Sequence, residues 1–352
     1  MKVVVTGATG NVGTSVVAAL ARDERVSEIV GLARRLPAWR PPRTRWVAAD
    51  VARDDLRAHF EGAAAVIHLA WLIQPSRDAA ELERVNVTGS RRVFETAASA
   101  GAGALVYASS VGVYSPGPSD RAVDESWPRD GVPSLFYARH KAITERILDA
   151  LEGELRVVRL RPGLVFKRES GPEIRRLFAG PLLPARLLGR LPLVPLPAGL
   201  AVQCVHGDDV GEAYRLAALS EDARGAYNVA ADPVLRGNEL AALLGSRRVD
   251  VPPRAVRVLA DVSYRARLQP TPPGWLDLGL AVPVMDTRRA REELSWTPRR
   301  SAREALLELL DGMRAPAGAP TPPLDAHAGG RFRLGELRTG VGAQAWESAS
   351  RR

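Results

Sequence analysis

Tyr137 and Lys141 stand four residues apart in a chain that contains only three lysines. On a helix, positions i and i+4 share one face, so this phenol and this ammonium can serve one site. A cation beside a phenol stabilises the phenolate and lowers the pKa of the tyrosine. A tyrosine with a lowered pKa is suited to general acid/base catalysis near neutral pH. Because the same spacing also arises by chance, the rest of the chain must decide between catalysis and coincidence.

The composition narrows the classes of protein. The 352 residues are 46% hydrophobic, so the chain can bury a full core and is not a disordered protein. The single Cys204 excludes an intrachain disulfide framework and a cysteine-based metal cluster. The five histidines are scattered without ligand-like spacing, so we expect no metal site.

The charge and the hydropathy pattern disfavour two further classes. The net charge is +9, but the arginines are spread along the chain rather than gathered on one element, which argues against nucleic-acid binding. The longest apolar region, 181–205, is broken by prolines, Arg186 and Arg190, and is not a plain membrane span. The apolar run at the N-terminus is too short for a signal peptide. We expect a cytoplasmic protein without nucleic-acid or membrane partners.

Strand-like and helix-like segments alternate up to residue 160, and these elements must position the Tyr-Lys pair. Strands are expected at 2–6, 29–32, 46–49, 65–69, 104–108 and 155–160. Helices are expected at 12–22, 54–60, 79–100 and 134–151, the last of which carries the Tyr-Lys pair. This alternation predicts an α/β fold with a doubly wound parallel sheet. Further helices are expected at 209–219, 288–294 and 302–313, and residues 315–352 have the composition of a disordered tail.

A glycine-rich turn joins the first expected strand to the first expected helix. Its glycines are Gly7, Gly10 and Gly13, with two residues in each interval. Missing side chains let backbone N–H groups approach a pyrophosphate, which the N-terminus of the following helix favours electrostatically. The strand before it and the helix after it are the context that a dinucleotide site requires. The expected cofactor contacts in this turn are Gly7, Thr9, Gly10, Asn11, Val12 and Gly13.

The glycine spacing resembles that of the extended short-chain dehydrogenases/reductases, specifically the NAD-dependent epimerase/dehydratase family. Further landmarks of that family follow in the same order: Asp50-Val51, Ile67-His68-Leu69-Ala70, Asn86-Val87-Thr88-Gly89, Val106–Tyr114, Leu160-Arg161-Pro162, Val205–Val210 and Asp286–Pro298, with Ser295 replacing a glycine in the last. Several motifs in order are more specific than any one of them. The resemblance implies that Asp50 and Val51 contact the adenine, and that Leu69 and Ala70 also line the cofactor site.

The resemblance also implies a division of the chain. Residues 1–162 are expected to form an NAD(P)-binding Rossmann domain, to which 201–230 return. Residues 163–314 are expected to form mainly a smaller substrate-binding lobe. In that lobe and in the loop at 71–74, apolar residues suggest a partly apolar pocket, whereas Arg175, Arg176, Arg186 and Arg190 could bind a nucleotide-sugar diphosphate. The sequence leaves both substrate classes open.

The end of the second strand bears on the choice of cofactor. Family members that bind NAD place an acidic residue there, where it contacts the ribose 2′-hydroxyl. In this chain Ala33 occupies that position, and Arg34 and Arg35 follow it. Guanidinium groups bind phosphate in bidentate fashion, which favours NADP(H) over NAD(H). The alternative is that both arginines belong to an arginine-rich surface loop.

The resemblance completes a reaction centre around the pair. Ser110 is expected to position a substrate oxygen, and Tyr137 to exchange a proton with that oxygen while hydride passes to or from the nicotinamide. Lys141 is expected to keep Tyr137 acidic and to bind the nicotinamide ribose, and Asn86 to support Lys141 through a water relay. Tyr137 and Lys141 thus count among the cofactor contacts as well as the catalytic residues.

The residues after Ser110 help to separate the reaction types. Sugar dehydratases of this family carry acidic residues there, whereas this chain has Val111 and Gly112. A carbonyl reductase or alcohol dehydrogenase is therefore expected. The alternatives are a nucleotide-sugar epimerase and a nonenzymatic NADP-sensing regulator. By resemblance, a homodimer would form through the helices expected at 79–100 and 134–151.

Overall fold

The structure is a computed structural model that describes residues 1–74, 76–179, 192–315 and 317–326. The expectations placed on Arg186, Arg190 and residues 327–352 lie outside the described residues.

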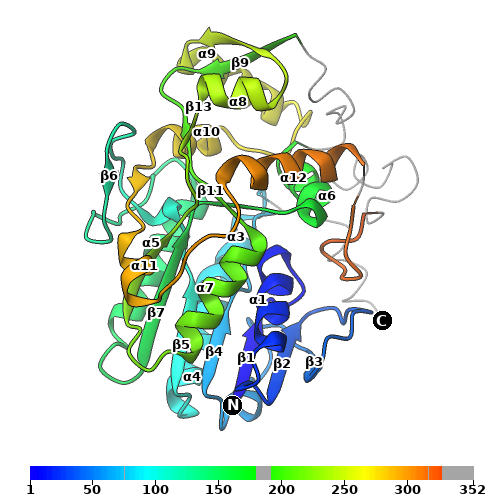
Figure 1. Cartoon of the computed structure of the whole chain (residues 1–352), viewed down its shortest axis with the longest axis vertical. Helices are drawn as coiled ribbons and strands as arrows, with labels where there is room; N and C mark the ends of the chain where they lie inside the picture. The colour runs from blue at the N-terminus through cyan, green and yellow to red at the C-terminus, as the bar shows by residue number, and fades with distance from the viewer. Residues whose placement is uncertain (75, 180–191, 316, 327–352) are drawn as a thin grey trace.

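A seven-stranded parallel sheet, in the lower half of Figure 1, forms the core of the larger part of the molecule. Its strands are β1 (Lys2–Thr6), β2 (Glu28–Ala33), β3 (Thr44–Ala48), β4 (Ala65–His68), β5 (Ala104–Ala108), β7 (Arg156–Pro162) and β12 (Gly225–Val229). They lie in the order β12-β7-β5-β4-β1-β2-β3, and every pair of neighbours is parallel. The chain leaves β1 in both directions, so the expected doubly wound Rossmann-type fold is confirmed.

Helices cover both faces of this sheet. On one face α1 (Asn11–Arg22) packs beside α7 (Gly207–Leu219), and both contribute to a core with β1, β4, β5 and β7. On the other face lie α2 (Arg57–Phe60), a long helical run after β4 and α5 (Phe136–Asp149). Strands buried on both sides consist of nearly continuous apolar runs, as Val3–Val5 illustrate.

The long helical run after β4 differs from the single helix expected at 79–100. It consists of α3 (Ala79–Glu83), a π-helical turn η1 (Arg84–Gly89) and α4 (Ser90–Ser99). A π-helical turn inserts an extra residue per turn and shifts the side chains that follow it. Asn86 lies within this turn.

Later parts of the chain return to the sheet. We expect residues 201–230 to return to the sheet domain, and β12, within that range, pairs with β7. Beyond that expectation, α11 (Arg288–Glu293) packs on the same core, and the fully buried Trp296 donates its indole N–H to the carbonyl of Asp209 at 2.8 Å.

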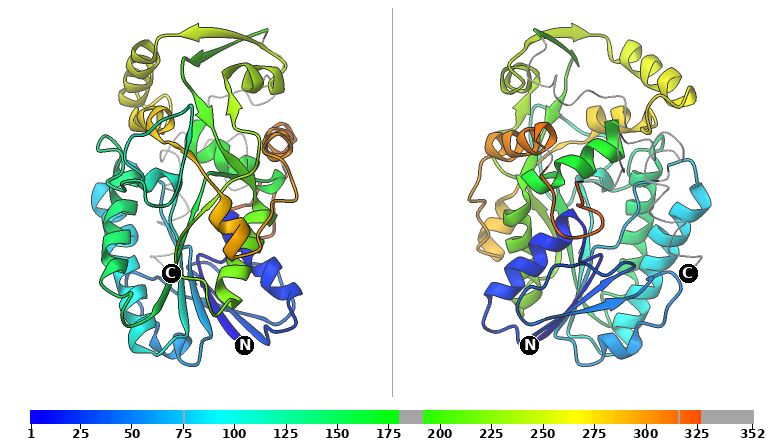
Figure 2. Two further views of the ribbon diagram at one scale, coloured as in Figure 1. Left: turned by 60° about the vertical axis from the view of Figure 1, so that its left-hand side comes forward. Right: turned by 90° about the vertical axis from the view of Figure 1, so that its right-hand side faces the viewer.

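The remaining elements build a lobe above the carboxyl ends of the strands (Figure 2). Its strands are β6 (Ala122–Val123), β8 (Leu164–Phe166), β9 (Leu193–Pro197), β10 (Ala201–Val202), β11 (Cys204–His206), β13 (Leu235–Arg236), β14 (Arg247–Val251) and β15 (Val284–Met285). Its helices are η2 (Val111–Val113), η3 (Arg168–Ser170), α6 (Gly171–Ile174), η4 (Arg175–Ala179), α8 (Gly237–Leu243), α9 (Pro253–Arg265), α10 (Gly274–Ala281) and α12 (Ala302–Arg314). Among the described helices, none has both the length and the apolar character that crossing a membrane requires.

The segment after α12 corrects one expectation. Residues 317–326 were expected to belong to a disordered tail, yet they fold back onto the body of the protein. Leu324 is fully buried and Thr321 is 2% exposed. The apolar side chain of Leu324 and two hydrogen bonds to the body, described below, hold this short stretch in place despite its lack of periodicity.

Candidate active site

The glycine turn has the geometry of a phosphate-binding loop. Gly7 adopts φ +67°, and a Cβ there would lie 2.7 Å from the backbone nitrogen of Ala70. A Cβ on Gly13 would lie 2.3 Å from the carbonyl oxygen of Gly7, so Gly13 allows α1 to pack against the turn. A Cβ on Gly10 would meet only the Gly7 oxygen, at 3.5 Å, which leaves the N-terminus of α1 open. Such an opening suits an anionic group.

A cavity of about 280 Å³ lies over this turn. Its lining includes most of the expected cofactor residues: Gly7, Thr9, Gly10, Ala33, Arg34, Arg35, Asp50, Val51, Leu69 and Ala70. The structure therefore brings together residues from the ends of β1, β2, β3 and β4. It also adds residues that the sequence did not indicate as cofactor contacts, namely Leu32, Ala49, Trp71, Leu72, Ile73, Gln74, Val85, Glu173, Arg176, Leu177, Pro322 and Pro323.

Three expected contacts in the glycine turn lie outside this lining. Val12 and Gly13 already belong to α1, and Asn11 turns toward the lobe. The Asn11 side chain donates to the carbonyl of Val165 at 3.0 Å, and its backbone carbonyl accepts from Lys167 Nζ at 2.7 Å. Asn11 thus fastens the start of α1 to β8 and the segment after it.

Arg34 and Arg35 enter the cavity beside Ala33, the last residue of β2. Asp50 lines the same cavity, and its carboxylate lies 3.8 Å from the guanidinium of Arg84. The end of β2 thus presents two cationic side chains and no acidic one to the cavity.

Ser110 and Tyr137 meet at the carboxyl end of β5. A Cβ on Gly112, which lies between the two side chains, would be 3.4 Å from the Ser110 hydroxyl oxygen. The Ser110 oxygen also accepts the backbone N–H of Gly112 at 3.0 Å, and a Cβ on Gly112 would lie 3.1 Å from the Tyr137 ring. The absence of a side chain at position 112 therefore lets the two side chains come together.

Lys141 lies one turn along α5, but it does not bind the phenol of Tyr137. Its ammonium donates to the carbonyl of Ala108 at 2.5 Å and to the hydroxyl of Tyr107 at 3.4 Å. Burial raises the pKa of Tyr137, and the neighbouring Ser110 hydroxyl only partly opposes this. The prediction of a lowered pKa for Tyr137 is thus wrong for this arrangement of side chains. Burial also holds the pKa of Lys141 well below its usual range, partly opposed by the charge of Glu145.

Aromatic rings surround the pair. The Lys141 ammonium lies 3.4 Å from the centre of the Trp71 ring, which also meets the Tyr137 ring edge-on at 5.9 Å. On its other side, Tyr137 contacts Trp275 with ring centres 5.0 Å apart, and Trp275 contacts Phe178 at 4.9 Å. Trp71 also lines the cavity over the glycine turn, so it stands between that cavity and Lys141. Tyr137 and Lys141 themselves are not part of the cavity lining.

Asn86 binds the loop after β4 through its side chain. Its side-chain nitrogen donates to the carbonyl of Leu72 at 2.8 Å, and its oxygen accepts the N–H of Leu72 at 2.7 Å. The π-helical turn directs the side chain toward this loop rather than toward Lys141. Asn86 therefore fixes the loop that carries Trp71, and its support of Lys141 through a water relay stays a prediction.

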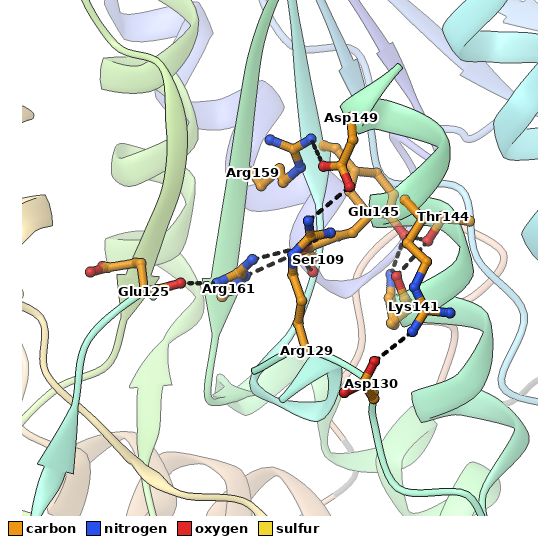
Figure 3. Close-up of polar contacts among 12 residues, drawn as sticks. Ser109, Glu125, Arg129, Asp130, Lys141, Thr144, Glu145, Asp149, Arg159 and Arg161 are labelled. Carbon is orange, nitrogen blue, oxygen red and sulfur yellow. Dashed lines mark hydrogen bonds and ion pairs between the residues drawn. The ribbon is translucent and has the colours of Figure 1, made fainter. Parts of the chain in front are cut away.

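The sequence missed a buried ion pair that anchors α5 (Figure 3). Glu145 is fully buried, and both of its oxygens accept from Arg161 on β7, at 2.9 and 2.6 Å. Ser109 donates to the same carboxylate at 2.5 Å. Burial alone would raise the pKa of Glu145, but the Arg161 guanidinium holds it below its usual range. The spacing could have indicated Glu145, because it follows Lys141 by four residues and therefore lies on the same face of the helix.

His68 joins the ends of β1 and β4 beneath the site. Its ring nitrogens lie 2.7 Å from the Thr6 hydroxyl and 2.9 Å from the Ser90 hydroxyl. Burial and the nearby charge of Lys141 lower the pKa of His68 to about 3, so the ring is neutral at physiological pH. His68 therefore connects strand ends rather than transferring protons.

Comparison with known proteins places this geometry in a family. The family model described as NAD dependent epimerase/dehydratase matches residues 3–230, which span the sheet, the glycine turn and the Ser-Tyr-Lys residues. The chain belongs to this family. The expected resemblance is thereby confirmed.

Individual relatives of the epimerase/dehydratase family agree with this assignment. The chain is 31% identical over 320 residues to the dTDP-6-deoxy-L-talose 4-dehydrogenase (NAD(P)(+)) of Kitasatospora kifunensis, covering 88% of this chain and 94% of that protein. It is 28% identical over 321 residues to an uncharacterized protein of Mycobacterium tuberculosis, covering 90% of this chain. The chain spans about a third of the length of the mycobacterial relatives, 31% of each.

Solved structures share the fold of this epimerase/dehydratase-family chain. The Thermus thermophilus UDP-glucose 4-epimerase in complex with NAD superposes with a TM-score of 0.64 at 22% identity, covering 89% of this chain and 99% of the epimerase.

Proposed function

We propose that this chain is an NADP(H)-dependent oxidoreductase that interconverts a ketone or aldehyde and the corresponding alcohol of a small molecule. The observation that carries this proposal is that Ser110 and the Tyr137 ring both lie against Gly112 at the carboxyl end of β5, one helical turn from the buried Lys141. Two hydroxyls placed in this way can both bind one substrate oxygen, and one of them can exchange a proton with it.

The cavity over the glycine turn supports the cofactor part of the proposal. The open position at Gly10 accommodates a pyrophosphate, and Arg34 and Arg35 would hold a ribose 2′-phosphate. Asp50, Val51 and Val85 would flank the adenine. The arginines are the basis for proposing NADP(H) over NAD(H), and the K. kifunensis relative carries NAD(P)(+) in its name.

The proposed reaction divides the work among three side chains. The nicotinamide supplies the hydride for reduction and accepts it for oxidation. The Ser110 hydroxyl donates a hydrogen bond to the substrate carbonyl oxygen. The Tyr137 hydroxyl gives its proton to that oxygen as the alcohol forms, and takes it back in the reverse direction. The Lys141 ammonium stabilises the phenolate that remains, through its positive charge.

The substrate class is proposed from a relative. The K. kifunensis protein is named as a dehydrogenase acting at a sugar 4-position, which supports oxidation of a secondary alcohol. The absence of carboxylates at Val111 and Gly112 also supports simple hydride transfer over dehydration. Nucleotide-sugar epimerisation and cofactor sensing without turnover remain alternatives. The cytoplasmic location also stays a prediction, as does a homodimer through the helical run at 79–100 and the helix at 134–151.

A single screen tests the proposal. Aldehydes, ketones, dTDP-sugars and UDP-sugars are incubated with the protein and each cofactor, while the absorbance of the reduced nicotinamide is followed. Net cofactor consumption with a carbonyl compound supports the reductase. Conversion of a UDP-sugar without net change in the cofactor supports the epimerase instead, and tight cofactor binding without any turnover supports the regulator.

A further inference from the structure

The segment 317–326 borders the cavity that the proposed function assigns to the cofactor. In Figures 1 and 2 it descends from the end of α12 past α6 toward the side of the sheet that carries β2 and β3. Pro322 and Pro323 line the cavity together with Arg34 and Arg35. The segment is therefore in contact with the same space as the residues proposed to hold the 2′-phosphate.

Hydrogen bonds attach the segment on two sides of the cavity. The backbone N–H of Trp39, in the loop between β2 and β3, donates to the carbonyl of Pro320 at 3.2 Å. The guanidinium of Arg176, on η4, donates to the carbonyl of Pro323 at 2.8 Å. The two prolines thus lie between attachments to the sheet domain and to the lobe.

The segment is also stabilised from within. The N–H of Leu324 donates to the carbonyl of Thr321 at 3.1 Å, and the N–H of Ala319 donates to the carbonyl of Leu324 at 3.1 Å. These bonds close a tight turn with the two prolines at its centre, where fixed φ angles limit backbone freedom. The fully buried side chain of Leu324 anchors the turn. A segment held in this way presents a preorganised surface to a ligand.

We propose that residues 317–326 form the outer wall of the dinucleotide site and retain the adenosine end of the cofactor by packing Pro322 and Pro323 against it. This inference rests on the proposed function, because it takes the cavity to be the NADP(H) site. The flat apolar faces of the two prolines complement a purine ring. Removal of the wall exposes the bound adenosine to water, so the loss of affinity arises mainly from faster dissociation.

Two truncated chains, each compared with the full chain, test whether residues 317–326 form this wall. One variant ends after Arg314 and lacks the segment, and the other ends after Ala326 and keeps it. The dissociation constant of NADPH is measured by nucleotide fluorescence, and the dissociation rate by displacement with excess 2′,5′-ADP. The variant ending at Arg314 should bind NADPH about tenfold more weakly and release it faster, because the apolar contact of the two prolines with the adenosine is lost. The variant ending at Ala326 should match the full chain within about twofold.

Matched point variants keep the test decisive if the shorter chain does not fold. Pro322→Ala removes a ring that lines the cavity, and Pro320→Ala removes an exposed ring two residues away. Only Pro322→Ala should speed NADPH release. Equal affinity in all variants, or tighter binding without the segment, overturns the wall. A full chain that binds neither NADPH nor NADH overturns the cofactor proposal itself, and the wall with it.

Discussion

The ammonium of Lys141 lies 3.4 Å from the centre of the Trp71 indole ring, closer than to the ring of Tyr137, whose centre is 5.7 Å away. A cation over an indole face is stabilised by the electron-rich face of the ring, most strongly where water is excluded. Trp71 therefore compensates part of the cost of burying Lys141 without neutralising its charge. The loop carrying Trp71 is in turn held by the side chain of Asn86.

Replacement of Trp71 should separate this electrostatic contribution from simple packing. Trp71→Phe keeps an aromatic face near Lys141, whereas Trp71→Leu keeps an apolar side chain without one. We expect the leucine variant to be less stable than the phenylalanine variant by about 1 kcal/mol. Urea unfolding of both variants measures the difference, and equal stabilities would show that the indole acts only as a space filler.

Loss of the Tyr137 hydroxyl should remove the proton transfer. Tyr137→Phe is expected to lower kcat by about 10²–10⁴-fold while NADPH still binds, since general acid/base catalysis contributes on this scale. The control is Tyr264→Phe, on α9, whose hydroxyl lies near Ser76. Steady-state kinetics and NADPH titration check both variants. Full activity of Tyr137→Phe on a substrate found in the screen would refute the mechanism.

The two arginines after β2 should determine the preference between cofactors. The double variant Arg34→Ala with Arg35→Ala is expected to weaken NADPH binding by about 10–100-fold, because charge-assisted hydrogen bonds to the 2′-phosphate are lost. NADH affinity should change far less. Arg45→Ala, an exposed arginine paired with Glu28, serves as the control. Titrations with both nucleotides decide the matter, and tighter NADH than NADPH binding by the unaltered chain would contradict the preference.

The buried pair of Glu145 and Arg161 should dominate the stability of the site. Glu145→Gln keeps the shape but leaves the guanidinium uncompensated, at a cost of roughly 3 kcal/mol in the free energy of unfolding. Asp149→Asn, in a partly exposed pair with Arg129 and Arg159, should cost less.

Because the pKa of Glu145 is lowered by folding, its ionisation stabilises the protein above pH 4.5 and this contribution is lost on acidification. Chemical unfolding at several pH values tests both points.

Glu173 should make the protein less stable as the pH rises, which is the opposite of the effect of Glu145. Burial raises its pKa from 4.5 to about 7, opposed by the charges of Arg176 and Lys167. Between these values the unfolded chain binds fewer protons at this position than the folded chain, so stability falls as pH rises from 4.5 to 7. Glu173→Gln cannot ionise at this position, so this pH dependence is removed. Relative to the unaltered chain, the variant should therefore gain more unfolding free energy at pH 8 than at pH 5. Unfolding curves at pH 5 and pH 8 check it, and an unchanged pH profile would exclude the effect.

Features encoded in consecutive residues could be predicted from the sequence. The glycine turn, the arginines after Ala33 and the run containing Ser110 each combine a backbone requirement with neighbouring side chains, and they lie where the order of motifs implies. The pairing of Asn86 with Leu72 depends instead on a π-helical turn, which hydrophobic periodicity does not reveal. The raised pKa of Tyr137 depends on burial by rings from distant segments, which no local pattern contains.

Tyr137, Lys141 and Glu145 follow one another at intervals of four along α5, so the groups proposed for catalysis and the carboxylate that anchors the helix share one face. Each residue of an α-helix advances the direction of the side chain by about 100°. A single residue inserted between Lys141 and Glu145 would therefore turn the catalytic groups away from Ser110 once the anchor is paired with Arg161. Between Tyr137 and Glu145, related sequences should therefore tolerate many substitutions but no insertion or deletion.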